Sequence, residues 1–281
     1  MKNITAMRMI LIEMLFFALT CFSLSVYGEE MKTEDTETYK QKDVNQGEDF
    51  TRPLNRFDVR YTTYNWSMDY NSGVFIFRTD MPFDLDGGWK FGFRADLPLV
   101  GSNVPAADNV QGDWKYGLGD ILTQGMFIKT YDEKIAYGFG VQLIWPTASY
   151  DNMGLGKYVI MPGGGIRYFL PDLGKGSFFA PVVSYRFDYA DNDKNRAHIS
   201  ELVLTPSFLI ALPTYTFISF YPNPEIKLNL NDGGKLFLPL DVMIGQMFSR
   251  NIIGSMEISV PLIQDYKQYD AKVEFRVGYF F

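Results

Sequence analysis

The chain is poor in the two residue types that most often build metal and disulfide sites. Among its 281 residues there is one cysteine, Cys21, and one histidine, His198. A zinc site of cysteines and histidines, or a framework of disulfides, needs several such residues. We therefore expect no metal site, no cofactor and no disulfide framework.

Long apolar runs, helical patterns and basic stretches are also missing. Beyond residue 28 no run approaches the about 20 apolar residues that a transmembrane helix needs, and no apolar period of 3.6 stands out. The chain carries 26 Lys and Arg against 33 Asp and Glu. An acidic chain without a basic stripe lacks the surface of a nucleic-acid binder, so we expect no nucleic-acid partner.

The first 28 residues have the pattern of a secretory signal peptide. Lys2 and Arg8 give a positive start, and a largely apolar segment follows from Leu11 to Leu24. We predict cleavage after Gly28, which would remove the only cysteine. A membrane anchor and, through Cys21, a lipoprotein are the alternatives.

What the chain has in excess is aromatic residues, 16% of the total, arranged in alternating segments. From residue 56 onward we count about twelve such segments, each with an apolar and a more polar face. The last one, Ala271 to Phe281, sets aromatic and aliphatic residues against Lys272, Glu274 and Arg276. A strict period of two predicts β-strands.

These strands predict an all-β fold, an antiparallel transmembrane β-barrel of about 12 strands over residues 56–281. The final strand, ending on Phe281, resembles the closing strand of bacterial outer-membrane barrels. In that family the terminal aromatic residue is read by the barrel assembly machinery. A soluble β-sandwich is the alternative, but it would not explain the aromatic excess or the terminal Phe.

The connections support a barrel because short turns and longer loops alternate along the chain. The longer ones are residues 101–115, 149–156, 190–197 and 263–269. Outer-membrane barrels have short periplasmic turns and longer extracellular loops. We therefore expect the outer membrane of a Gram-negative cell, with lipid and lipopolysaccharide around the barrel. An even strand count would place both termini in the periplasm.

The charged face of each strand should line the lumen, because an Arg or Lys facing lipid at mid-depth costs about 2–4 kcal/mol. The signs are mixed, so pairing that stiffens the wall is the alternative to a polar path. Twelve strands predict a narrow or partly plugged lumen. The candidate lumen-lining residues are Lys90, Arg94, Asp96, Asp120, Arg167, Arg186, Asp188, Glu201, Glu274 and Arg276.

Residues 29–55 precede the first strand and are acidic and hydrophilic over most of their length. This composition favours a flexible N-terminal arm. A small plug that reaches into the lumen is the alternative.

Two short motifs carry a resemblance to a known family. Gly117 to Asp120 reads GLGD, and a later strand ends in WPT at Trp145 to Thr147. This arrangement is similar to the outer-membrane barrel family named after the MetA pathway of phenol degradation, although Ala148 stands where that family usually has Gly. The resemblance implies a transporter of aromatic or other small hydrophobic compounds. We therefore expect a channel for passive uptake of small, hydrophobic or aromatic solutes, and no enzyme activity.

Two other functions are kept as alternatives. One is a structural or adhesive barrel that acts through its loops. The other is a lipid hydrolase, because twelve-stranded outer-membrane phospholipases carry a His-x-Ser pair and this chain has His198 and Ser200. A histidine beside a serine can act as the base that activates its hydroxyl. Those enzymes continue with Asn and Gly, whereas here Glu201 and Leu202 follow.

Overall fold

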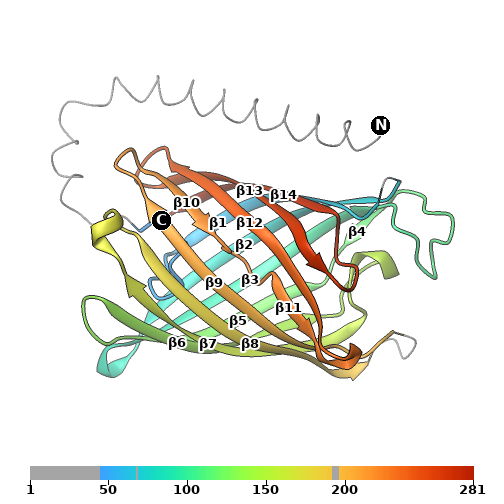
Figure 1. Ribbon diagram of the computed structural model, residues 1–281, viewed down its shortest axis with the longest axis horizontal. Coiled ribbons are helices and arrows are strands. Elements are labelled where there is room, and N and C mark those ends of the chain that lie inside the picture. Colours follow the sequence, from blue (N-terminus) through green and yellow to red (C-terminus); the bar gives the residue numbers. More distant parts are fainter. Residues whose placement is uncertain (1–44, 68, 192–195) are drawn as a thin grey trace.

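The computed structural model describes residues 45–281 apart from residues 68 and 192–195 (Figure 1). The expected signal peptide and the first part of the acidic arm lie outside the described residues. The strands are β1 (Arg56–Asn65), β2 (Asn71–Asp84), β3 (Trp89–Ser102), β4 (Lys115–Leu118), β5 (Ile121–Thr130), β6 (Ile135–Trp145), β7 (Lys157–Phe169), β8 (Phe178–Asp191), β9 (Ser200–Ala211), β10 (Thr216–Phe220), β11 (Ile226–Asn229), β12 (Lys235–Met247), β13 (Ile252–Gln264) and β14 (Ala271–Phe280).

The only helical elements in the described ranges are short 3-10 turns. They lie at Asp86–Gly88, Asp151–Met153, Pro171–Leu173 and Leu230–Asp232. Within the same ranges, no helix has the length and apolar character needed to cross a membrane.

The strands form one closed antiparallel barrel. β4 and β5 both pair with β3 and are the two parts of one wall strand, and β10 and β11 both lie between β9 and β12. The fourteen strands thus make twelve wall strands. β1 pairs with β14 over its whole length, from Arg56 opposite Phe280 to Asn65 opposite Ala271. The predicted 12-stranded barrel, closed by its last strand against its first, is confirmed.

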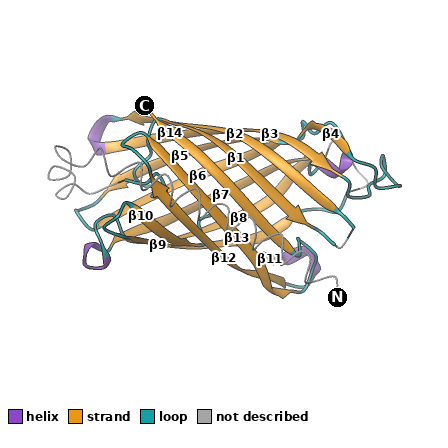
Figure 2. Ribbon diagram, turned by 90° about the horizontal axis from the view of Figure 1, so that it is seen from above, coloured by secondary structure: helices purple, strands orange, loops and turns teal. Residues whose placement is uncertain are grey.

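The two ends of the barrel differ in their connections. At one end, here called the short-turn end, β2–β3, β5–β6, β9–β10 and β12–β13 are joined by four residues each, and the chain enters β1 and leaves β14. At the other, the long-loop end, residues 103–114 and 146–156 form extended loops. Figure 2 shows the strands running obliquely between these ends. The predicted sorting of turns and loops is therefore present for these connections, whereas the turn between β7 and β8, residues 170–177, is longer than expected.

The alternating sequence gives the wall two faces. On β1, Arg56, Asp58 and Arg60 are buried inside the barrel, whereas the neighbouring Phe57 and Tyr61 are exposed on the outside. The strands therefore turn their charges inward, as the cost of placing them against lipid requires.

The inner face is not only charged. At the short-turn end an apolar cluster formed by residues such as Phe178, Leu209, Phe217, Met243 and Ile253 is buried inside the barrel. The sequence pattern predicts that the apolar face of each strand contacts lipid. Near this end, however, β9, β10 and β12 are apolar on both faces, so one apolar face of each lies inside the barrel. The lumen is thus partly filled there by side chains of its own wall.

Candidate functional site in the barrel lumen

Residues 45–55, here called the N-terminal plug, lie inside the barrel at the short-turn end. Gln46, Asp49 and Thr51 are buried. Phe50 and Leu54 pack against the apolar cluster of the wall. The flexible arm predicted for residues 29–55 lies largely outside the described residues, and residues 45–55 are inside the barrel.

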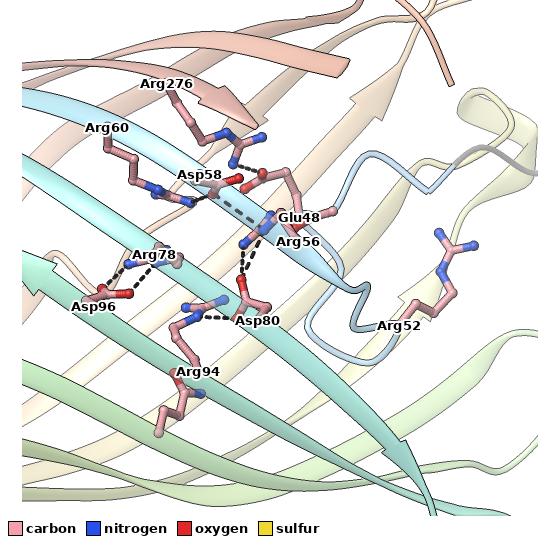
Figure 3. Close-up of polar contacts among 12 residues, drawn as sticks. Glu48, Arg52, Arg56, Asp58, Arg60, Arg78, Asp80, Arg94, Asp96 and Arg276 are labelled. Carbon is pink, nitrogen blue, oxygen red and sulfur yellow. Dashed lines mark hydrogen bonds and ion pairs between the residues drawn. The ribbon is translucent and has the colours of Figure 1, made fainter. Parts of the chain in front are cut away.

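The plug is held by arginines of the wall. Glu48 forms an ion pair with Arg276 of β14 (Figure 3). Asp49 lies 3.3 Å from Nε of Arg167 on β7, and the same Nε donates to Thr51 Oγ1 at 3.2 Å. Two wall arginines thus have plug carboxylates as ion-pair partners, so plug and wall are complementary in charge.

A dense set of ion pairs lines the inner face of β1, β2, β3 and β14 beside the plug (Figure 3). We call it the arginine cluster, and it comprises Arg56, Asp58, Arg60, Arg78, Asp80, Arg94, Asp96, Glu274 and Arg276. Arg78 bonds Asp96 through Nε at 2.7 Å and Nη2 at 2.6 Å. Asp80 accepts from Arg56 at 2.7 Å and from Arg94 at 2.7 Å. Such forked pairs are strong and geometrically specific.

A second polar cluster lies on the inner face of β13 and β14. Lys272 is buried between Glu257 and Glu225, with its Nζ 2.7 Å from Glu225 Oε1. Tyr269, in the loop before β14, donates to Glu225 Oε2 at 2.9 Å. Burial, with Glu225 beside the phenol, raises the pKa of Tyr269 above its ordinary value. The phenol therefore stays protonated as a donor.

The wall strand made of β10 and β11 is interrupted at residues 221–225, where the sequence places Pro222 and Pro224. Proline cannot donate to a strand ladder, so it favours such breaks. Tyr221 adopts a left-handed conformation with φ 51°. Asn223 reaches inward and donates to Glu257 at 2.6 Å. The break thus brings a second piece of chain into the lumen.

Plug, break and arginine cluster together line a partly open cavity of about 140 Å³. Part of its lining is polar, with Arg60, Arg94 and Asn223. Another part is apolar, with Phe50 of the plug and Met126 and Ile128 of β5. The lumen is therefore narrowed around a small pocket with an apolar side and a charged side that contains both arginines and carboxylates.

The ten residues predicted to line the lumen lie in several different environments. Arg94, Asp96, Glu274 and Arg276 belong to the arginine cluster, and Arg167 binds the plug. Arg186 pairs with Glu201 at 2.9 Å across β8 and β9, and Asp188 pairs with Lys157 at 3.1 Å. Lys90 is exposed at the short-turn end, 3.5 Å from Asp84.

Asp120, the tenth residue, lies between β4 and β5 towards the long-loop end and has a different environment. Its carboxylate accepts hydrogen bonds from the backbone amides of Ala148 and Leu155. Thr147 completes the contact, because its Oγ1 donates to Gly119 O and accepts from Ile121 N. The two motifs that carry the family resemblance therefore meet, and Asp120 holds the loop after β6.

Several residues of the lumen were missed by the sequence reasoning. Arg56, Asp58 and Asp80 alternate in register with Arg60 and Arg78, so the period of two could have found them. Glu48 and Glu225 carried no such signal. An acidic arm and a proline-flanked break predict exposure, whereas both carboxylates face arginine or lysine inside the barrel.

His198 and Ser200 do not form a base and nucleophile pair. His198 Nδ1 lies 2.9 Å from Asp188 Oδ2, whereas Ser200 Oγ lies 2.8 Å from the hydroxyl of Tyr185. No hydrogen bond joins His198 to Ser200 in the part of the chain that the structure describes. This geometry does not support the hydrolase alternative.

Comparison with known proteins shows which solved structures have a similar fold. The chain matches no protein-family model and no curated protein sequence. It is similar in structure to an outer membrane channel from Pseudomonas putida F1, with 16% identity, a TM-score of 0.60, and coverage of 85% of this chain and 100% of that one. A second solved structure, the NanC porin, has 11% identity, a TM-score of 0.50, and coverage of 80% and 98%.

These similarities define the class: a twelve-stranded β-barrel of the outer-membrane type. The fold that the resemblance to the phenol-degradation family implies, an outer-membrane β-barrel, is confirmed, since the similar channel from Pseudomonas putida F1 has this fold. Outer membrane phospholipase A from Escherichia coli is also similar, at 9% identity over 87% of this chain and 96% of that one, but its TM-score of 0.46 is too low to bear on function.

Proposed function

We propose that the protein is an outer-membrane channel for passive passage of small solutes through its lumen. The observation that carries the proposal is the two-faced closed wall, apolar outside and charged inside, around a lumen narrowed by the plug and by the break at residues 221–225. A wall of this kind suits lipid on one side and a polar path on the other. The narrowing limits the path to small solutes.

In this proposal the short-turn end faces the periplasm and the long-loop end faces the cell exterior. The support is the general asymmetry of outer-membrane barrels, whose periplasmic turns are short. The apolar outer face would contact lipid and lipopolysaccharide. The exposed Phe281, at the end of the closing strand, would be presented to the assembly machinery.

Small hydrophobic or aromatic compounds are the solutes we propose first. The apolar cluster on the inner wall and the apolar part of the cavity lining support this class, because neither suits a purely hydrated ion. The similarity to the channel from Pseudomonas putida F1 agrees with a channel role.

The test is solute entry into liposomes that contain the purified protein. Liposome swelling with neutral solutes of graded size should show entry of the smallest solutes and a sharp loss with increasing size. Liposomes with no protein, and with heat-denatured protein, are the controls. Swelling no faster than in the controls for every solute would mean a sealed barrel and would contradict the channel function.

Attachment through the loops is the second candidate, and one observation favours it. In the loop between β3 and β4 the side chains of Val110 and Trp114 are exposed, and Trp114 stacks on the exposed Tyr116 of β4 at 6.1 Å. Exposed apolar groups of this kind often mark contact surfaces. Binding of whole cells to a surface or partner that is lost in a Trp114→Ser variant, while solute entry is kept, would support attachment.

A further inference from the structure

We propose that the cavity between the plug and the arginine cluster binds a small organic acid whose apolar body is about the size of one ring. The proposal rests on the channel function above, which it deepens by naming the chemical class of solute. It differs from that function in requiring a negative charge on the solute.

The size of the cavity sets the size of the ligand. Its volume is about 140 Å³. For comparison, an engineered apolar cavity of about 150 Å³ is known to hold benzene. A single ring with a small substituent fits this volume, whereas a disaccharide does not.

The lining provides for both halves of such a molecule. Met126 and Ile128 of β5 and Phe50 of the plug give an apolar surface for the ring. Arg60 and Arg94 give guanidinium groups for the carboxylate of the solute, although Glu48 and Asp80 also line this side of the cavity. A purely polar ion would not contact the apolar part of the lining, and a neutral hydrocarbon would not pair with the arginines.

Arg94 and Arg60 each have N–H donors that make no hydrogen bond within the described chain. Arg94 bonds Asp80 through Nε, which leaves both of its Nη groups without a hydrogen bond in the described chain. Arg60 is 5% exposed, and its Nε is buried with no partner. Since guanidinium groups bind carboxylates in a forked geometry, Arg94 is the residue best placed to hold the solute carboxylate.

The carboxylate of Glu48, in the plug, would compete with the carboxylate of the solute for the arginines of the cluster. The cluster contains five arginines but four wall carboxylates, and Glu48, paired with Arg276, supplies the missing negative charge. Glu48 also lines the cavity. Arg276 contacts Glu48 through Nη1, and its buried Nε and Nη2 have no hydrogen-bond partner among the described residues. A bound organic acid provides the same charge, so its binding competes with the contact between Glu48 and the wall.

The test is calorimetric titration of the purified full chain in detergent with three probes. Benzoate has the ring and the charge, benzamide is its neutral counterpart, and acetate has the charge without the ring. Because an unpaired buried charge or an empty apolar surface each costs more than about 1.4 kcal/mol, we expect benzoate to bind at least about tenfold more tightly than either.

Variants separate the roles of the side chains. Glu48→Gln removes the rival carboxylate, so benzoate should bind several-fold more tightly, and Arg94→Gln should weaken benzoate binding about tenfold. Glu133→Gln is the matched control, because Glu133 is exposed in the turn between β5 and β6, and it should leave binding unchanged. Circular dichroism checks the fold, and Arg94→Lys replaces Arg94→Gln if the latter does not fold.

Three results would overturn the proposal: equal binding of benzoate and benzamide, equal binding of benzoate and acetate, or no effect of Glu48→Gln on the benzoate affinity. The binding measurement does not depend on solute passage. Benzoate binding without solute entry into liposomes would therefore overturn the channel and keep the site, and solute entry without benzoate binding would do the reverse.

Discussion

At the scale of single residues, the lumen is built from charges that each need a partner. Lys272 is the clearest case, because it is 2% exposed and lies between Glu225 and Glu257. Removing one member of a buried pair leaves the other charge buried and uncompensated. The lumen network should therefore tolerate single changes poorly.

Lys272→Met should accordingly destabilise the barrel by about 3–5 kcal/mol. Urea unfolding in lipid vesicles, followed by tryptophan fluorescence, measures the change. Lys235→Met is the control, since Lys235 forms an exposed pair with Asp232 and such pairs contribute about 0–1 kcal/mol. Equal stability of the two variants would show that Lys272 is not buried as described.

Asp120 offers a second prediction for a single residue. Its carboxylate accepts from the partly buried backbone amides of Ala148 and Leu155, so Asp120→Ala leaves both donors without this partner, at a cost of at most about 1–3 kcal/mol each. The loop after β6 should then become sensitive to limited proteolysis while the barrel keeps its resistance. Asp113→Ala, at an exposed position in the loop before β4 at the same end, is the comparison variant. An unchanged cleavage pattern in Asp120→Ala would contradict the role of Asp120 in holding the loop.

At the scale of elements, the plug lies in the lumen and lines the cavity. Pro53 lies against β3, where a Cβ added at Gly92 would be 3.7 Å from the Cβ of Pro53. Disulfides span Cβ atoms about 3.5–4.5 Å apart.

Pro53→Cys with Gly92→Cys, in a Cys21→Ser background, should therefore form a disulfide on oxidation. Mass spectrometry of the oxidised protein detects it. Gly88 is the control position, because a Cβ added there has no atom within 4 Å, so Pro53→Cys with Gly88→Cys should stay reduced. If the Gly92 pair stayed reduced as well, the plug would not lie against β3.

The wall elements could be predicted from the sequence, but the plug and the lumen contacts could not. Alternation in segments such as Ala271–Phe280 directly reflects a wall with lipid on one side and charge on the other. The same pattern gives the number of wall strands and the sorting of turns. It does not tell which inward charges meet, because pairs such as Arg60 and Glu274 depend on closure of β1 against β14. Nor does it show that Glu48 is buried, since hydrophilic composition alone predicts exposure.

At the scale of the whole molecule, the protein is a barrel whose lumen is narrowed from within by the plug and by the break at residues 221–225. The wall alone would leave an inner face with more arginine than carboxylate beside β1 and β14. Glu48 of the plug pairs with Arg276, and Asp49 lies between Arg167 of the wall and Arg52 of the plug. The plug thus adds negative charge beside the arginines of the wall. Weakening the contacts of Glu48 and Asp49 with the wall should widen the lumen and make it more positive.

Single-channel recording in planar bilayers tests this most directly, comparing the wild-type chain with Glu48→Gln/Asp49→Asn and with Glu133→Gln/Asp172→Asn. The second pair makes the same charge change in exposed turns at the same end of the barrel. We predict small conductance steps for the wild type and the exposed-turn pair, and larger, more anion-selective steps for the plug pair. Equal conductance and selectivity in all three proteins, or no channels in any of them, would contradict a conducting lumen narrowed by the plug.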